Sequence, residues 1–249
     1  MTWPEAVLVF VAGVGAGTIN AVVGSGTLMT FPALLAAGLP PVLANVSNTV
    51  GLVPGTLAAS VGYKRELGGQ GRRVRRLVPA SLLGSLIGGV LLLSLPSSAF
   101  KAVVPALILL GCTLVVLQPR LGKLITRPDG QHHRGAWWVW PSVLLAGVYG
   151  GYFGAAQGVL LMAVLGIGLD TDLQRMNAIK NVLAFTVNGV AAVLFVIVTD
   201  IDWKAAGLIA VGSALGGALG SAFGRRLPPV ALRAIIVVVG VTAAASMLT

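Results

Sequence analysis

Long runs of apolar residues fill most of this chain, and short polar stretches separate them. The apolar segments run over 5–39, 42–63, 77–95, 99–117, 137–169, 176–199, 204–223 and 229–248. A helix needs about 20 predominantly apolar residues to cross the hydrocarbon core of a bilayer. The pattern therefore predicts an all-α fold, a polytopic transmembrane helix bundle built from about eight apolar segments.

The first and fifth segments are too long for a single crossing. Glycines and polar side chains interrupt both, at Asn20, Gly24, Ser25 and Gly26 in one and at Gln157 and Gly158 in the other. Glycine allows the backbone to leave the helical conformation. We expect each segment to break into two helical legs that form a hairpin, followed by three spanning helices.

The second half of the chain repeats motifs of the first half about 132 residues later. The clearest pairs are Asn45-x-x-Asn48-Thr49-Val50 with Asn177-x-x-Lys180-Asn181-Val182, and Ser81-x-x-Gly84-x-x-x-Gly88 with Ser213-x-x-Gly216-x-x-x-Gly220. Several matches in the same order indicate two repeats, 1–117 and 137–249, joined by a linker loop at 118–136. Duplicated halves in a membrane chain are typical of transporters whose site lies between the repeats.

The basic residues indicate how the two repeats are oriented. If 5–39 and 137–169 each crossed once, a larger share of the Lys and Arg residues would lie outside. If each enters and returns, every Lys and Arg except Lys101 and Lys204 falls on one side, with Asp200 and Asp202 on the other. Cytoplasmic loops carry the excess of Lys and Arg. The second topology is favoured; it makes the 64–76 and 118–136 loops cytoplasmic and the repeats inverted.

Composition narrows the class of protein. Hydrophobic residues make up 56% and charged residues 10% of the 249 residues, whereas soluble domains carry about 25% charged residues. The net charge of +10 would suit a nucleic-acid partner. The basic residues lie in short loops between apolar segments, however, which is a pattern of membrane orientation.

Polar residues within the apolar segments gather at equivalent places in the two halves. Buried amides and hydroxyls need hydrogen-bond partners, which a bound solute supplies, and the free N–H groups that start a helix favour an anion. For any one amide, the alternative is a hydrogen bond between helices. The candidate substrate-binding residues are Asn20, Gly24, Ser25, Gly26, Thr27, Asn45, Asn48, Thr49, Gln157, Gly158, Asn177, Lys180 and Asn181.

Lys180 is the sharpest of these candidates, because charges within a membrane are usually functional. The alternative is a lysine that extends along its helix to the cytoplasmic surface. No catalytic residues or cofactor are expected, since the apolar segments almost lack Asp and Glu and the chain has no Walker motif. His132 and His133 have no acidic or cysteine partner at ligand spacing, so no metal site is expected.

Motifs from both halves resemble those of the TauE/SafE family, the sulfite and organosulfonate permeases. They are Ala16-Gly17-x-x-Asn20-x-x-x-Gly24-x-Gly26, Phe31-Pro32-x-Leu34-Leu35, Ala44-Asn45-x-x-Asn48-Thr49 and Arg175-Met-Asn177-Ala-x-Lys180-Asn181. The resemblance covers nearly the whole chain and implies export or uptake of sulfite, sulfoacetate or related sulfur anions. By resemblance, the site residues are Asn20, Gly24, Gly26, Asn48, Thr49, Gly158, Lys180 and Asn181. Thr27 stands where a further glycine is common in the family.

Residues and resemblance together predict a permease that moves a small anion, such as sulfite or a sulfonate, by alternating access at a midplane site between the repeats. The alternatives are a permease for another small solute and a non-transporting membrane scaffold or assembly protein. We expect a multi-pass protein of the plasma or inner membrane that is not an enzyme. Its partners are the small anion and the lipid bilayer, without nucleic acid, and the prediction leaves room for a homodimer.

Overall fold

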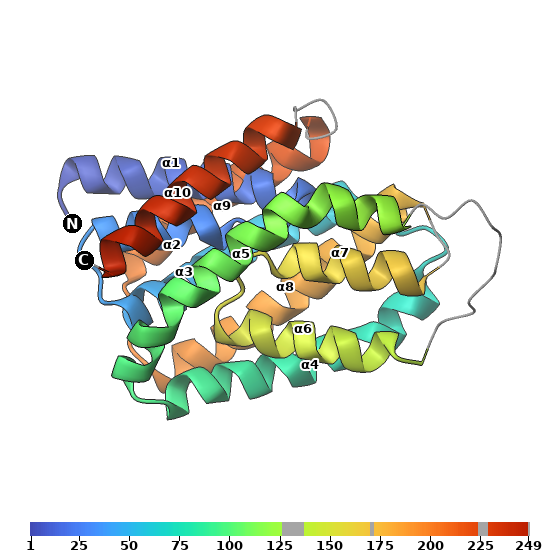
Figure 1. Cartoon of the computed structure of the whole chain (residues 1–249), viewed down its shortest axis with the longest axis horizontal. Helices are drawn as coiled ribbons and strands as arrows, with labels where there is room; N and C mark the ends of the chain where they lie inside the picture. Colours follow the sequence, from blue (N-terminus) through green and yellow to red (C-terminus); the bar gives the residue numbers. More distant parts are fainter. Residues whose placement is uncertain (126–136, 170–171, 224–228, 249) are drawn as a thin grey trace.

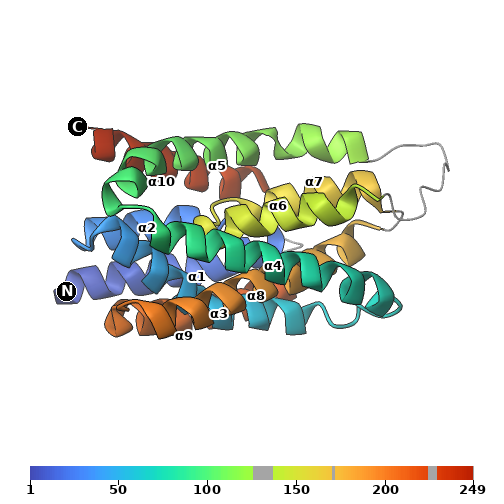
Figure 2. The same ribbon diagram turned by 90° about the horizontal axis from the view of Figure 1, so that it is seen from below.

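The computed structural model describes residues 1–125, 137–169, 172–223 and 229–248, which form α-helices and no strand. The helices lie side by side along the long axis of the molecule (Figures 1 and 2). The predicted all-α bundle is confirmed. In chain order the helices are α1 (Trp3–Val22), α2 (Thr27–Ala36), α3 (Pro41–Gly62), α4 (Gly71–Ser94), α5 (Ser97–Ile125), α6 (Val139–Tyr152), α7 (Gln157–Gly168), α8 (Leu173–Val198), α9 (Trp203–Phe223) and α10 (Pro229–Leu248).

The expected break inside each long apolar segment is confirmed. The first segment divides into α1 and α2, and the fifth into α6 and α7. Gly24 and Gly154 lie in the two turns with φ of 89° and 78°, a conformation that glycine adopts at little cost. Each pair forms a hairpin, and the two hairpins enter the bundle from opposite ends (Figure 1).

Six helices in the described residues are long and apolar enough to cross a membrane: α1, α3, α4, Ser97–Arg120 of α5, α8 and α9. The second hairpin legs α2 and α7 are apolar but shorter, and so is Arg233–Ala245 of α10. The predicted spans therefore correspond to real apolar helices. The chain is a multi-pass membrane protein.

Glycine-rich faces hold the two halves together. Helix α1 of the first half packs against α9 of the second, and α4 of the first half packs against α6 of the second. A Cβ atom on Gly17 would collide with the carbonyl of Ser213, and one on Gly88 with the carbonyl of Val148. Small residues of this kind allow membrane helices to approach closely. The halves are therefore interlocked in one bundle.

Two helices extend into stretches that the sequence suggested were loops. Helix α4 begins at Gly71, which places Arg72–Arg76 in its first turns, and α5 continues to Ile125. Arg, Lys and Leu are good helix formers, so these helices continue past their apolar parts. The 64–76 loop is shorter than expected. The remainder of the 118–136 linker, with His132 and His133, lies outside the described residues.

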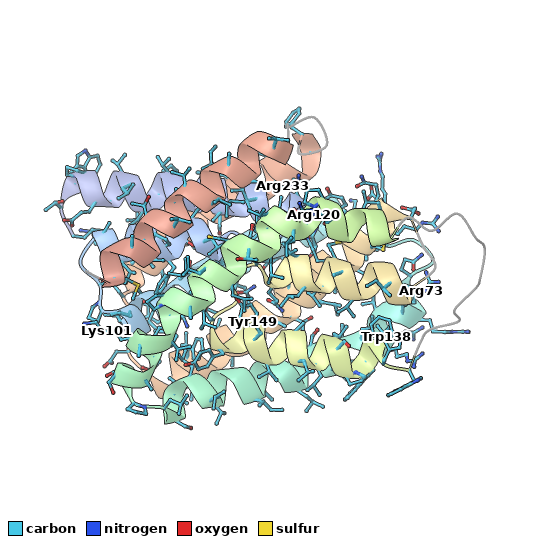
Figure 3. All side chains as sticks on the ribbon, in the orientation of Figure 1. Arg73, Lys101, Arg120, Trp138, Tyr149 and Arg233 are labelled. Atoms are coloured by element: carbon cyan, nitrogen blue, oxygen red, sulfur yellow. The ribbon has the colours of Figure 1, made fainter. Side chains whose placement is uncertain are left out.

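Two cations, Arg73 and Lys101, lie at opposite ends of the bundle (Figure 3). The first hairpin is open at the Lys101 end and the second at the Arg73 end (Figures 1 and 3). The cytoplasmic side, the repeat boundaries and the inverted relation of the repeats remain predictions.

Candidate functional site

The tips of the two hairpins touch in the interior of the bundle. The backbone N–H of Gly158, at the start of α7, donates to the carbonyl oxygen of Gly24 over 2.9 Å. A Cβ atom on either glycine would collide with the backbone of the other. The candidate residues around both tips are thereby brought together: Ser25 and Thr27 beside Gly24, and Gln157 beside Gly158, all buried.

The end of α1 is surrounded by polar side chains from α8. The Lys180 ammonium donates to the carbonyl oxygens of Asn20 at 2.9 Å and Ala21 at 3.4 Å. Asn177 and Asn181 donate through their amide nitrogens to the same Ala21 oxygen, at 3.0 Å and 3.4 Å. The last carbonyls of a helix have no partner within it, so these side chains satisfy them.

Lys180 is completely buried. The alternative of a lysine reaching the membrane surface is therefore wrong. Ion pairs in the described residues include those of the N-terminus with Glu5 and of Arg175 with Asp172; neither involves Lys180. The Lys180 ammonium has three N–H donors and gives them to two neutral backbone carbonyls. These carbonyls do not neutralise its charge as a carboxylate would.

The end of α6 receives an amide from α3 in a similar way. The side-chain nitrogen of Asn45 donates to the carbonyl oxygen of Tyr152 over 3.0 Å. Asn48 lies one helical turn further along α3 and is 1% exposed. Neither its amide nitrogen nor its amide oxygen has a hydrogen-bond partner among the described residues.

Some candidate residues have a clear structural role. The side-chain oxygen of Asn20 accepts a hydrogen bond from the N–H of Gly26 at 2.7 Å, which closes the turn between α1 and α2. The hydroxyl of Thr49 donates to the carbonyl of Asn45 in its own helix at 2.9 Å. The Asn20 side-chain oxygen and the Thr49 hydroxyl therefore already have partners within the protein.

Other candidates carry buried polar atoms without partners. Leaving such an atom unpaired costs roughly 1–3 kcal/mol, so a cluster of them marks a place for a polar ligand or water. In the described part of the chain these atoms are Ser25 Oγ, Asn45 Oδ1, both amide atoms of Asn48, Gln157 Nε2, Asn177 Oδ1 and Ser81 Oγ.

The two helices that begin at the hairpin tips differ in their free N–H groups. No hydrogen bond is found within the described ranges for the N–H of Ser25 or Thr27, at the start of α2. At the start of α7, the N–H groups of Gln157, Gly158 and Val159 all have acceptors. The expected anion-binding helix start is therefore better formed on the first hairpin than on the second.

Two polar side chains, the half-buried Tyr149 and the buried Ser81, were not among the sequence candidates. The Tyr149 hydroxyl donates to the carbonyl of Ala155 over 2.6 Å and closes the turn after α6. Ala156 in that turn has φ of 59°, the left-handed conformation. Ser81 was expected only in a helix-packing motif, yet its buried hydroxyl has no partner among the described residues. For Tyr149, the available sequence signal was its position directly before Gly150-Gly151.

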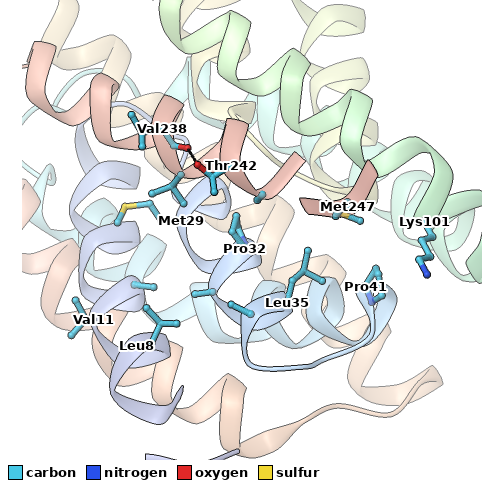
Figure 4. Close-up of a pocket in the computed structure, with 15 residues that line it drawn as sticks. Leu8, Val11, Met29, Pro32, Leu35, Pro41, Lys101, Val238, Thr242 and Met247 are labelled. Atoms are coloured by element: carbon cyan, nitrogen blue, oxygen red, sulfur yellow. Dashed lines mark hydrogen bonds between the residues drawn. The ribbon is translucent and has the colours of Figure 1, made fainter. Parts of the chain in front are cut away.

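A groove of about 910 Å³ lies elsewhere, between α1, α2, α10 and the start of α5 (Figure 4). Apolar side chains such as Leu8, Met29 and Val238 line it, with Lys101 at one edge. The Thr242 hydroxyl donates a hydrogen bond to the carbonyl of Val238 over 2.8 Å. None of the candidate residues lines this groove. Its lining suits hydrocarbon rather than a small polar solute.

Comparisons with known proteins agree with the membrane fold. The chain is 30% identical over 216 residues to a probable membrane transporter protein of Haemophilus influenzae, covering 86% of this chain and 83% of that one. It is 27% identical over 245 residues to the probable membrane transporter protein ORF9 of a Sinorhizobium species, covering 96% and 90%. The probable membrane transporter protein YfcA of Escherichia coli K12 is 27% identical over 252 residues, covering 97% and 88%. No solved structure matches the chain.

The family comparison covers both hairpins and all the candidate residues. The model described as sulfite exporter TauE/SafE matches residues 9–247. The match begins within α1 and ends within α10, so it includes both hairpin tips and the α3 and α8 amides. The resemblance seen in the sequence motifs is thereby confirmed, and the chain belongs to the TauE/SafE family of membrane transporters.

Proposed function

We propose that this protein is a secondary transporter for a small oxyanion, with sulfite, sulfonates and related sulfur anions as its substrate class. The observation that carries the proposal is Lys180, which is fully buried and has no acidic partner among the described residues. Burying an uncompensated charge costs several kcal/mol. A small anion beside Lys180 would compensate it.

The neutral groups near the hairpin tips suit the same ligand. Three buried side-chain donors have no partner in the described residues: Ser25 Oγ, Gln157 Nε2 and Asn48 Nδ2. The backbone N–H groups of Ser25 and Thr27, at the start of α2, also have no acceptor there. An oxyanion presents several acceptor oxygens to such donors. Helix starts also attract negative charge through their dipole. We therefore assign the substrate site to the space around the tips and Lys180.

The two hairpins offer a route for alternating access. They enter from opposite ends, and their tips meet through Gly24 and Gly158. The candidate polar side chains around this contact are buried or nearly so, which corresponds to a site closed to both sides. Moving one hairpin with its half of the bundle would open the site to one side of the membrane. An ion gradient, the substrate's own gradient or a separate subunit would drive the movement.

Uptake into proteoliposomes tests this function. Purified protein would be offered labelled sulfite, sulfoacetate and other small sulfonates, with an uncharged solute in the same panel. We expect uptake of one or more of the anions above that of empty liposomes, and loss of most of it in Lys180→Ala. Lys204→Ala is the matched control, because Lys204 is exposed at the bundle end, where its ammonium donates to the carbonyl of Met1.

Two other functions make different predictions in this experiment. A permease for another solute would transport the uncharged compound and leave the anions outside. A scaffold or assembly protein would transport nothing, and its Lys180→Ala variant would differ from the parent only in stability. Uptake of no anion by well-folded protein would end the proposal.

A further inference from the structure

The two broken helices α1 and α6 end in the same backbone geometry. At the end of α1, the carbonyl of Ile19 accepts hydrogen bonds from the N–H groups of both Val23 and Gly24. At the end of α6, the carbonyl of Tyr149 likewise accepts from the N–H groups of Phe153 and Gly154. Both glycines have positive φ. The carbonyls of Gly150 and Gly151 therefore correspond in position to those of Asn20 and Ala21.

These equivalent carbonyls have different partners. Those of Asn20 and Ala21 receive the Lys180 ammonium. Helix C-termini carry partial negative charge, so a cation is the expected partner there. Among the described residues, the carbonyls of Gly150 and Gly151 accept no hydrogen bond from outside α6.

The residue that corresponds to Lys180 in the first half is Asn48, as Asn45 corresponds to Asn177. Asn45 already reaches the end of α6 and contacts Tyr152. Its other amide atom, Oδ1, is buried and has no partner among the described residues, and the same holds for Oδ1 of Asn48. Residues three apart on a helix lie on one face. The face of α3 that reaches the end of α6 through Asn45 thus carries two buried amide oxygens without partners among the described residues.

We propose that a monovalent alkali cation, sodium, binds at the end of α6, where it takes the place that the Lys180 ammonium takes at the end of α1. Its ligands would be Asn45 Oδ1, Asn48 Oδ1 and the carbonyl oxygens of Gly150 and Gly151. Hard cations bind amide and carbonyl oxygens, and the C-terminal ends of broken helices hold sodium in transporters. A neutral oxygen set favours a single positive charge over a divalent or transition metal, for which the described residues offer no cluster of acidic, His or Cys side chains.

The sodium site adds a coupling ion to the proposed function and shares Asn48 with the proposed anion site, but its other ligands, Asn45, Gly150 and Gly151, are not anion ligands. Binding can therefore be measured without substrate. Purified protein in detergent would be tested for saturable binding of radioactive sodium. Its thermal unfolding would be followed in sodium chloride, potassium chloride and choline chloride of equal ionic strength.

We expect saturable sodium binding by the parent and a higher unfolding midpoint in sodium than in choline. Asn45→Ala and Asn48→Ala should each weaken sodium binding at least ten-fold. Asn48→Lys should abolish it, because the new ammonium would occupy the site, and should make the unfolding midpoint independent of sodium. Asn188→Ala is the control, since the Asn188 amide nitrogen donates to the carbonyl of Ala184 in its own helix.

The isosteric variant Asn48→Asp keeps the test decisive if the alanine variants fold poorly. A carboxylate oxygen at this position should tighten sodium binding at least ten-fold. The proposal is overturned if the parent shows no saturable sodium binding, or if any folded variant at Asn45 or Asn48 binds sodium with the parental affinity. A shift with potassium equal to that with sodium would contradict the choice of sodium.

Discussion

Gly158 donates its backbone N–H to the carbonyl oxygen of Gly24 across 2.9 Å, although the two residues lie in different halves of the chain. The bond joins the tips of two hairpins that enter the bundle from opposite ends. No side chain fits between them, because a Cβ on either residue would strike the other backbone. In the transport cycle proposed above, moving one hairpin against the other would change this contact.

Replacing Gly24 by alanine should disrupt the contact between the tips. The new Cβ would meet the backbone of Gly158, and φ of 89° is itself unfavourable for alanine, at roughly 1–2 kcal/mol. We expect Gly24→Ala to lower the unfolding midpoint and abolish anion uptake. Gly38→Ala is the matched control, because Gly38 has φ of 82° but no neighbour within 4 Å of its Cβ position. Equal effects of the two substitutions on uptake would mean that the tip contact has no special role.

Lys180→Ala should weaken anion binding more than the loss of a neutral donor. A hydrogen bond with a charged group contributes roughly 1.5–3 kcal/mol, against about 1 kcal/mol for a neutral one. Since about 1.4 kcal/mol corresponds to ten-fold in affinity, we expect at least about a ten-fold loss in Lys180→Ala and less in Ser25→Ala. Anion binding can be measured by titration calorimetry on purified protein.

Lys180 also satisfies the end of α1, so the affinity measurement needs a control for folding. Lys180→Arg keeps the positive charge, although its planar fork replaces a compact ammonium. We expect this variant to retain more affinity than Lys180→Ala at a similar unfolding midpoint. If Lys180→Ala binds anions as the parent does, Lys180 serves only the end of α1.

Gly216→Ala should destabilise the packing of α9 on α1. The added methyl group would collide with the backbone carbonyl of Val14, and overpacking of this kind costs roughly 1–3 kcal/mol. Gly207→Ala lies on the same helix with nothing within 4 Å of its Cβ position. Alanine is a better helix former than glycine by roughly 0.5–1 kcal/mol, so Gly207→Ala should be neutral or stabilising. The unfolding midpoints of the two variants in detergent compare them directly.

Cysteine labelling tests which end of the bundle is cytoplasmic. Lys64 and Asp200 are both exposed and lie in loops at opposite ends. In a Cys112→Ala background, an impermeant reagent added to intact cells should label Asp200→Cys and leave Lys64→Cys unlabelled. Lys64→Cys should become reactive when the cells are opened. The reverse pattern would contradict the orientation derived from the basic residues.

Much of the helical framework could be predicted from the sequence. Apolar runs of membrane-spanning length located the helices. Asn20 and Gly24–Gly26 located the break at 23–26, whereas Gln157 and Gly158 lie just after the second break at 153–156, at the start of α7. The extension of α4 to Gly71 and of α5 to Ile125 was missed, because charged residues at a membrane helix end resemble a loop in composition alone. Boundaries of this kind are set by helix propensity and headgroup contacts together.

The candidate site was predictable as a set of residues but not as an arrangement. The sequence by itself determined the membrane class, the duplicated motifs and the polar positions, because these depend on hydrophobicity and spacing along the chain. Only the tertiary structure decided that Asn20 closes a turn, that Lys180 is buried against α1, and that Asn48 has no partner among the described residues. A buried polar group is satisfied by whichever element packs beside it, and contacts across more than a hundred residues are set by helix packing rather than by local pattern.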